Sequence, residues 1–312
     1  MEKKFVSVVV YLNDCATGIE SFLSTVIPTV QNYFENYELV CVDDACTDDT
    51  LDKIREYTKK NMPTGMVSLV HMGKYQGIEP SMNAGRDVAI GDFVYEFDST
   101  VCDYDAKLIT DAYETLVEGY DIVSVYPSTG MRLFSKIFYG IYNRSNHGRA
   151  KIGTETFRLI SRRAINRIKS LGDYIPYRKA VYANCGLESK RIPYAKLRSV
   201  KGAKQRKTYQ RMKLAMDSFI YFTNFLERIS SVISAIFLLT TVGFVSYAIY
   251  DYCVNKAAIE GWTSTICFMS FGFFGVFLLL TIILKYMSVM LNLIFKRQKY
   301  LVSSIEKVGS DK

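Results

Sequence analysis

The sequence contains only two histidines, one tryptophan and six prolines among its 312 residues. Its seven cysteines are scattered, and no two of them have the Cys-x-x-Cys spacing. A zinc site built from cysteine and histidine is therefore not expected, and neither is the disulfide framework of a small secreted domain. We interpret the cysteines as small, reduced residues of the core.

A secretory signal peptide is also not expected at the N-terminus. Residues 5–12 form an apolar run after Lys3 and Lys4, but Asn13 and Asp14 follow at once. The run is short and no small-residue cleavage site follows it. It predicts a buried first β-strand.

Basic residues exceed acidic residues by 39 to 31, which gives a net charge of +8. Part of this excess lies directly before the apolar C-terminal third, in Lys196, Arg198, Lys201, Lys204, Arg206, Lys207, Arg211 and Lys213. A basic cluster beside apolar segments favours anionic lipid headgroups. Membrane lipids are the expected partner, and nucleic acid is not, because no nucleic-acid-binding motif accompanies the cluster.

Strand and helix signals alternate through the first 126 residues. The expected strands are residues 6–12, 39–42, 66–71, 93–97 and 122–126. The expected helices are residues 19–30, 50–59, 81–89 and 106–117. This alternation predicts an α/β fold with a mostly parallel, Rossmann-like sheet, whose ligands bind at the carboxyl ends of the strands.

Two long apolar segments, 229–250 and 263–290, predict a transmembrane hairpin, since each exceeds the roughly 20 residues that cross a bilayer. The alternative is a helical hairpin buried in a large soluble core. Basic residues flank both outer ends, which predicts that both are cytoplasmic. The expected division is an α/β domain (1–205), a basic, amphipathic interfacial helix region (206–228), two membrane helices (229–290) and a cytoplasmic tail (291–312).

Carboxylates follow two of the expected strands. Asp43 and Asp44 end the second strand, and Asp98 comes directly after the fourth. The first pair can accept hydrogen bonds from a base or ribose, and Asp98 can hold a divalent cation against a diphosphate. Helix capping and loop initiation are the alternative roles for these residues.

Together these elements resemble the family 2 glycosyltransferases, which have the GT-A fold. The family pattern reads Asn-Glu after the first strand, Asp-Asp-x-Ser-x-Asp, Asn-x-Gly, Ala-x-Gly and Asp-x-Asp. The corresponding residues are Asn13-Asp14, Asp43-Asp44-Ala45-Cys46-Thr47-Asp48, Asn83-Ala84-Gly85, Ala89-Ile90-Gly91 and Asp98-Ser99-Thr100. Residues 153–163 are similar to the family's Gly-x-Phe-x-Leu-x-x-Arg segment.

The segment 132–144 and the two apolar segments resemble the polyprenyl-phosphate sugar synthases within that family. The resemblance implies catalytic roles for Asp98, Arg132 and Arg158. It implies a nucleotide-sugar site formed by Tyr11, Asn13, Asp14, Asp43, Asp44, Asn83, Gly85 and Asp98. It implies that the acceptor lipid phosphate is bound by Arg132, Lys136 and Arg158.

The chain departs from the family pattern at Thr100, which replaces the second aspartate of Asp-x-Asp. The resemblance implies a Mg²⁺ or Mn²⁺ ion at Asp98, but the loss of one carboxylate puts this cation in question. Asp103 or Glu96 are candidates to compensate for the missing ligand. A processive polysaccharide synthase is not expected, because the Gln-x-x-Arg-Trp motif of such enzymes is absent.

The leading hypothesis is inverting transfer of a sugar from a UDP- or GDP-sugar to polyprenyl phosphate. The enzyme is then a multi-pass protein of the inner membrane with a cytoplasmic catalytic domain. This hypothesis is compatible with a homo-oligomer. A second hypothesis is a capsule or lipopolysaccharide glycosyltransferase that acts on a sugar hydroxyl, with Asp173 or Glu188 as the general base. A third, motivated by Thr100, is an inactive membrane scaffold.

Overall fold

The computed structural model describes residues 1–62, 66–129, 133–145, 151–171, 177–197, 232–240, 242–243, 246–247, 250, 261–295 and 300–308. The chain divides into two compact units. One comprises Met1–Leu214 with Lys296–Lys312, and the other comprises Ala215–Phe295.

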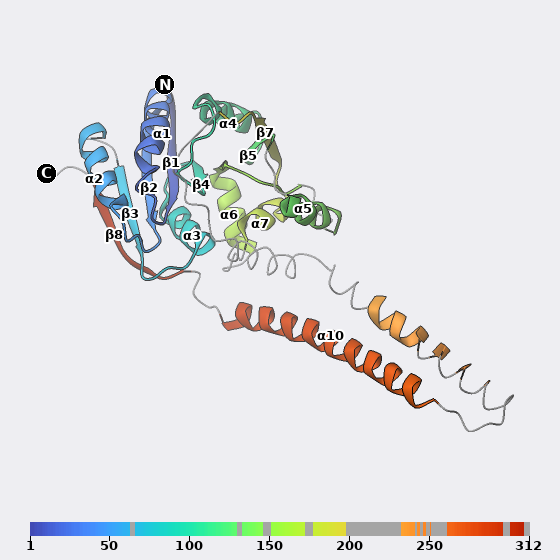
Figure 1. The fold of residues 1–312 in the computed structure, drawn as a ribbon. Coiled ribbons are helices and arrows are strands. Elements are labelled where there is room, and N and C mark those ends of the chain that lie inside the picture. Colours follow the sequence, from blue (N-terminus) through green and yellow to red (C-terminus); the bar gives the residue numbers. More distant parts are fainter. Residues whose placement is uncertain are drawn as a thin grey trace. The chain divides into compact units, whose positions relative to one another are not determined.

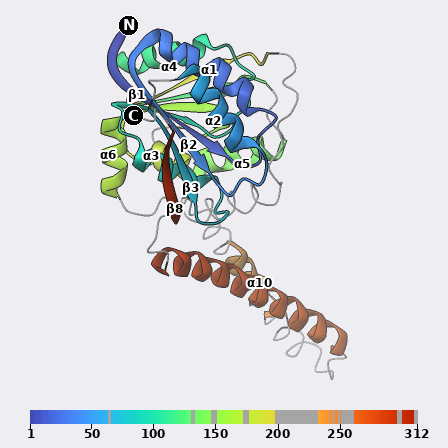
Figure 2. The ribbon, with the colours of Figure 1, turned by 90° about the vertical axis from the view of Figure 1, so that its left-hand side faces the viewer.

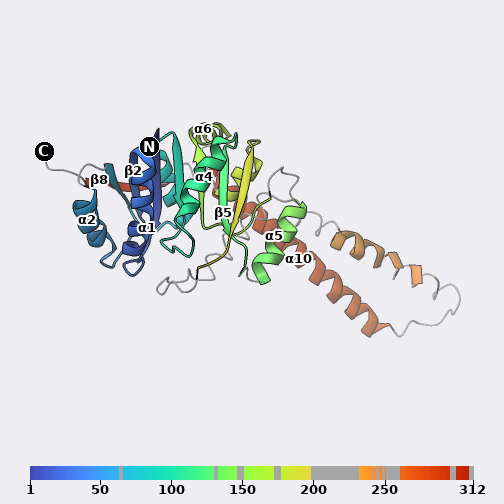
Figure 3. The ribbon, with the colours of Figure 1, turned by 90° about the horizontal axis from the view of Figure 1, so that it is seen from above.

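The first unit is built on an eight-stranded sheet with the order β7-β5-β6-β4-β1-β2-β3-β8. Figure 3 shows this sheet from β8 near one edge to β5 near the other. The strands are β1 (Glu2–Leu12), β2 (Phe34–Asp43), β3 (Met66–Met72), β4 (Phe93–Phe97), β5 (Ile122–Pro127), β6 (Phe157–Ser161), β7 (Ser189–Tyr194) and β8 (Val302–Val308). The predicted α/β fold with a mostly parallel sheet is confirmed, since β1 pairs in parallel with β2 and β4, β2 with β3, and β5 with β7.

Two strands that the sequence analysis does not predict interrupt the parallel order. β6 lies antiparallel between β4 and β5, so these two predicted strands are not neighbours. The register of β4 and β6 sets Glu96 opposite Arg158. The C-terminal β8 pairs antiparallel with β3 and closes the sheet edge (Figure 1).

Helices cover both faces of this sheet, as Figure 2 shows for α1 and α2 on one side and α3 and α6 on the other. The first layer is α1 (Ile19–Tyr33), α2 (Thr50–Asn61) and α4 (Lys107–Val117). The second is α3 (Ile78–Val88), α6 (Arg162–Leu171) and α7 (Arg178–Asn184), and α5 (Leu133–Ser145) follows β5. The apolar run of β1 is continuous because both faces are buried, whereas α1 buries only the residues at helical spacing.

Gly85 allows α3 to pack closely against the sheet. A Cβ built at this position would lie 2.4 Å from Val42 Cγ2 and 2.5 Å from Val9 Cγ1. Real Cβ atoms do not approach other carbons this closely, so any larger residue must push α3 away from β1 and β2.

We therefore expect Gly85→Ala to lower the free energy of unfolding by about 1–3 kcal/mol through overpacking. Gly140→Ala is the matched control, because a Cβ in that helical position meets nothing within 4 Å. The control is expected to be neutral or stabilising by up to about 1 kcal/mol. Urea unfolding of both variants checks this, and equal effects would contradict the packing role of Gly85.

The second unit contains α10 (Trp262–Phe295). Among the residues that the structure describes, no helix has the length and apolar character needed to cross a membrane. The predicted transmembrane hairpin is thus not supported by the fold. The interfacial helix region 206–228 lies outside the described residues, as do residues 229–231, 241, 244–245 and 248–249 of the first apolar segment.

Candidate active site

Asp44 organises the loops at the carboxyl ends of β1 and β2. Its side chain is fully buried and accepts hydrogen bonds from the Tyr11 hydroxyl at 2.8 Å and the backbone N–H groups of Gln76 at 2.7 Å and Gly77 at 2.8 Å. The Asn13 amide donates to the Asp44 carbonyl at 2.9 Å. The structure thus brings Tyr11, Asn13 and Asp44 together. In this structure Asp44 fixes the loop before α3, and its contact with a nucleoside stays a prediction.

Asp14 and Asp43 brace the same loops. Asp14 accepts hydrogen bonds from the Thr47 backbone N–H at 2.8 Å and the Thr47 hydroxyl at 3.1 Å. Asp43 accepts one from the Cys46 N–H at 2.8 Å. Asp14 and Ala45 have positive φ angles of 48° and 56°, a conformation that costs side-chain-bearing residues about 1–2 kcal/mol. Such strain concentrates at functional loops, which agrees with a site at this edge.

The C-terminal strand β8 reaches these loops through side chains that the sequence analysis did not single out. Glu306 forms an ion pair with Arg55 of α2 at 2.9 Å and lies 3.3 Å from His71 Nε2, while His71 Nδ1 lies 2.9 Å from Asp43. Gln76 donates to the Leu301 carbonyl at 2.7 Å and accepts from the Leu301 N–H at 2.9 Å. The strand is therefore linked to Asp43 through His71, and Leu301, the residue directly before the strand, is linked to Asp44 through Gln76.

We expect Gln76→Ala to weaken binding of UDP or GDP about fivefold or more, because the loop that Asp44 holds loses its two side-chain bonds to Leu301. Gln31→Ala is the matched control, since Gln31 also donates two hydrogen bonds, to the Tyr37 hydroxyl and the Asn61 carbonyl. Isothermal titration with each nucleotide checks the prediction. Equal nucleotide affinity in the two variants would show that β8 does not act on the site.

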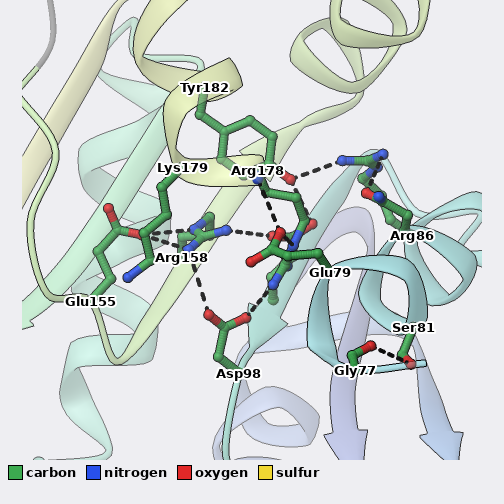
Figure 4. A network of polar contacts seen from close by, with 12 residues as sticks. Gly77, Glu79, Ser81, Arg86, Asp98, Glu155, Arg158, Arg178, Lys179 and Tyr182 are labelled. Carbon is green, nitrogen blue, oxygen red and sulfur yellow. Dashed lines mark hydrogen bonds and ion pairs between the residues drawn. The ribbon is translucent and has the colours of Figure 1, made fainter. Parts of the chain in front are cut away.

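A buried network of charges surrounds Asp98, just past β4 (Figure 4). Its centre is Arg178 at the start of α7, which is fully buried. The Arg178 guanidinium donates to Glu79 at 2.9 Å, to Glu96 at 2.8 Å and to Asp98 at 2.7 Å. One side chain thus ties α3, β4 and the loop after β4 to α7.

Arg158 of β6 forms the second half of the network (Figure 4). It donates to Glu155 at 2.6 Å and to Glu96 at 3.0 Å, and it lies 3.8 Å from Asp98. Its guanidinium also lies over the Tyr182 ring, 5.0 Å from the centroid. Because Arg158 is engaged by these carboxylates, a lipid phosphate would have to compete with them, and its predicted acceptor role stays a prediction.

Both arginines are fixed cations. Burial lowers the pKa of Arg178, but Asp98, Glu79 and Glu96 raise it, and the net shift is well upward. Burial likewise lowers the pKa of Arg158, and its carboxylate neighbours, led by Glu155, more than reverse this. Among the four carboxylates of the network, Asp98 has the largest side-chain exposure, at 19%. It is therefore the member that a ligand can reach.

The other predicted site residues lie in different settings. Asn83 accepts a hydrogen bond from Arg86 at 3.0 Å, and Gly85 packs against the sheet. Lys136 is exposed on α5, while Arg132 lies outside the described residues. Sequence reasoning missed Arg178, Glu79 and Tyr182, because the contacts between them and with Glu96 join residues 82 to 99 positions apart.

The described residues do not provide the ligand set of a divalent cation site. Such ions prefer several oxygen ligands, usually carboxylates. Thr100 lies against the β1–α1 loop, with its hydroxyl 3.0 Å from the position of a Cβ on Gly18. Within the described part of the chain, no group of three or more histidine, cysteine, aspartate or glutamate side chains is placed to hold a metal.

A mostly parallel sheet with an aspartate just past β4 at its carboxyl edge is the arrangement of a GT-A glycosyltransferase. Comparison with known sequences agrees, because the description "Glycosyl transferase family 2" matches residues 7–169, just over half of the chain. The chain belongs to this family and is a glycosyltransferase.

Relatives and a solved structure extend this result. An uncharacterized glycosyltransferase of Synechocystis sp. is 24% identical over 96% of this chain and 95% of its own length. A prophage bactoprenol glucosyl transferase homolog of Escherichia coli is 24% identical over 60% of this chain and 63% of its own. A mannosyltransferase from Pyrobaculum calidifontis, solved with GDP-mannose and Mn²⁺, superposes with a TM-score of 0.53 at 14% identity, over 96% of this chain and 89% of that one. This structural likeness shows the fold.

Proposed function

We propose that the enzyme transfers a sugar from a nucleotide-sugar to polyprenyl phosphate at the cytoplasmic face of the inner membrane, with inversion. The observation that carries the transfer chemistry is Asp98, held by two buried arginines at the carboxyl edge of the sheet. The acceptor is argued from the resemblance of segment 132–144 to lipid-phosphate enzymes and from relatives named bactoprenol glucosyl transferases.

The proposed acceptor, a lipid phosphate, requires positively charged protein groups and no strong general base. A lipid phosphate is already ionised at neutral pH, so its attack on the anomeric carbon requires no strong general base. The protein must position two anionic substrates and offset their repulsion. An arginine such as Arg132, which is proposed to bind the acceptor phosphate, suits this task because it remains charged and donates in a planar fork.

The membrane location rests on the sequence. The segments 229–250 and 263–290 are apolar, and the basic cluster at 196–213 precedes them. Such a cluster is attracted to anionic headgroups on the cytoplasmic leaflet. An active site close to that surface could bind the phosphate of polyprenyl phosphate while the polyprenyl chain remains in the bilayer.

For the alternative, transfer to a sugar hydroxyl, Glu188 is an unsuitable general base because of its position in the sheet. The Glu188 carbonyl accepts the backbone N–H of Asp121, at the amino end of β5, which is the edge of the sheet opposite to Asp98. Glu188 is therefore not placed to deprotonate an acceptor at Asp98. The other candidate, Asp173, lies outside the described residues.

Product analysis tests the proposal directly. The full-length protein is incubated with a panel of UDP- and GDP-sugars and with either undecaprenyl phosphate or soluble sugar acceptors, and products are read by mass. The proposal predicts a glycosylated lipid phosphate, lost in Asp98→Asn. Products formed only on hydroxyl acceptors would replace it with the alternative, and no product with any donor would contradict both.

We expect Arg132→Lys to lower kcat/KM for undecaprenyl phosphate by at least about tenfold, or roughly 1.4 kcal/mol, because lysine cannot donate bidentately to phosphate. Nucleotide-sugar affinity should not change. Arg144→Lys is the control, since Arg144 is an exposed arginine of α5. If Arg132→Lys behaves like this control, or if both respond equally to added salt, the acceptor phosphate is not bound by Arg132.

A further inference from the structure

Both carboxylate oxygens of Asp98 face a guanidinium group. Oδ1 accepts from Arg178 Nη2 at 2.7 Å, and Oδ2 lies 3.8 Å from Arg158 Nη2 (Figure 4). The two arginines are almost fully buried. A divalent ion bound to Asp98 would compete with the contacts that both guanidinium groups already make with its two oxygens.

The carboxylates named as substitutes for the missing aspartate at position 100 are committed to other partners. Glu96 accepts from Arg158 and Arg178 on one oxygen and from the Tyr182 hydroxyl on the other. Asp103 accepts from the Tyr194 hydroxyl and forms an ion pair with Lys196 at 2.9 Å. Turning either side chain to a metal at Asp98 would break these contacts.

Thr100, which replaces the second aspartate, is buried. Its hydroxyl lies against the start of α1, 3.0 Å from the position of a Cβ on Gly18. Among the described residues, the second aspartate of the family pattern is thus replaced by Thr100, and the candidate substitutes Glu96 and Asp103 already have other partners. What stands beside Asp98 is a pair of guanidinium groups.

We propose that this enzyme binds its nucleoside diphosphate sugar without a divalent cation, and that Arg178, supported by Arg158, takes the place of that cation beside Asp98. The proposal rests on the proposed use of a nucleotide-sugar donor. It differs from the arrangement expected from the Asp-x-Asp pattern, in which the ion bridges carboxylates and diphosphate. Here the fixed positive charge is part of the fold, since it also joins α7 to α3 and β4.

The test begins with the wild-type protein. Electron paramagnetic resonance of free Mn²⁺ is recorded with equimolar protein and no nucleotide, and Kd values for the UDP- and GDP-sugar panel are measured in EDTA and in Mn²⁺. The proposal predicts no loss of the free Mn²⁺ signal and Kd values that agree within about threefold. Stoichiometric Mn²⁺ binding by the protein, or donor binding only in Mn²⁺, would overturn it while the proposed function stands. Donor binding in neither buffer would instead remove the proposed function, and with it the basis of this inference.

Arg178→Gln is the decisive variant. Removing the guanidinium exposes Asp98 and Glu96, so donor affinity in EDTA should fall about tenfold or more and should be partly restored by Mn²⁺. Arg163→Gln is the control, because Arg163 is a mostly exposed arginine 3.8 Å from Asp121. Circular dichroism confirms that both fold. An Arg178→Gln affinity equal to that of the control would overturn the role of Arg178, and if the variant does not fold, the wild-type Mn²⁺ measurement decides.

Discussion

The guanidinium of Arg178 is the contact on which the candidate active site depends. It pairs with Glu79 of α3, Glu96 of β4 and Asp98 beyond that strand, and the Arg178 side chain itself is fully buried. Desolvating these charges is costly, and a buried pair is weak evidence for stability. Removing one partner, however, typically costs about 3–5 kcal/mol because the others remain buried and unpaired. The network therefore fixes Asp98 in one position, as the catalytic role proposed for this carboxylate requires.

Several residues of the family motifs serve the architecture around this network. Gly85 lets α3 approach the sheet, and Gly91 donates to Ser7 of β1 while a Cβ there would lie 2.7 Å from the Ser7 nitrogen. Asp44 holds the loop before α3. These motifs thus specify the backbone around the network, whose most accessible carboxylate is Asp98.

The sequence predicted the first half of the fold well because its signals are local. Apolar runs and helical spacing placed the first five strands and four helices, and aspartates after strands marked the edge where the site lies. β6, β7 and β8 were not predicted, because their pairing depends on partners far away in the chain. For example, Glu306 of β8 forms an ion pair with Arg55, which lies 251 residues earlier. Arg178 escaped for the same reason: nothing in Tyr177-Arg178-Lys179 shows that its partners lie 80 to 99 residues earlier.

The coupling between Arg178 and Asp98 is tested most directly by a double-mutant cycle. Free energies of unfolding are measured in urea for the wild type, Asp98→Asn, Arg178→Gln and the double variant. If the two side chains interact directly, the double variant should lose less free energy of unfolding than the two single variants lose together. The difference should exceed about 1 kcal/mol. Additivity within about 0.5 kcal/mol would contradict the pairing and the site built on it.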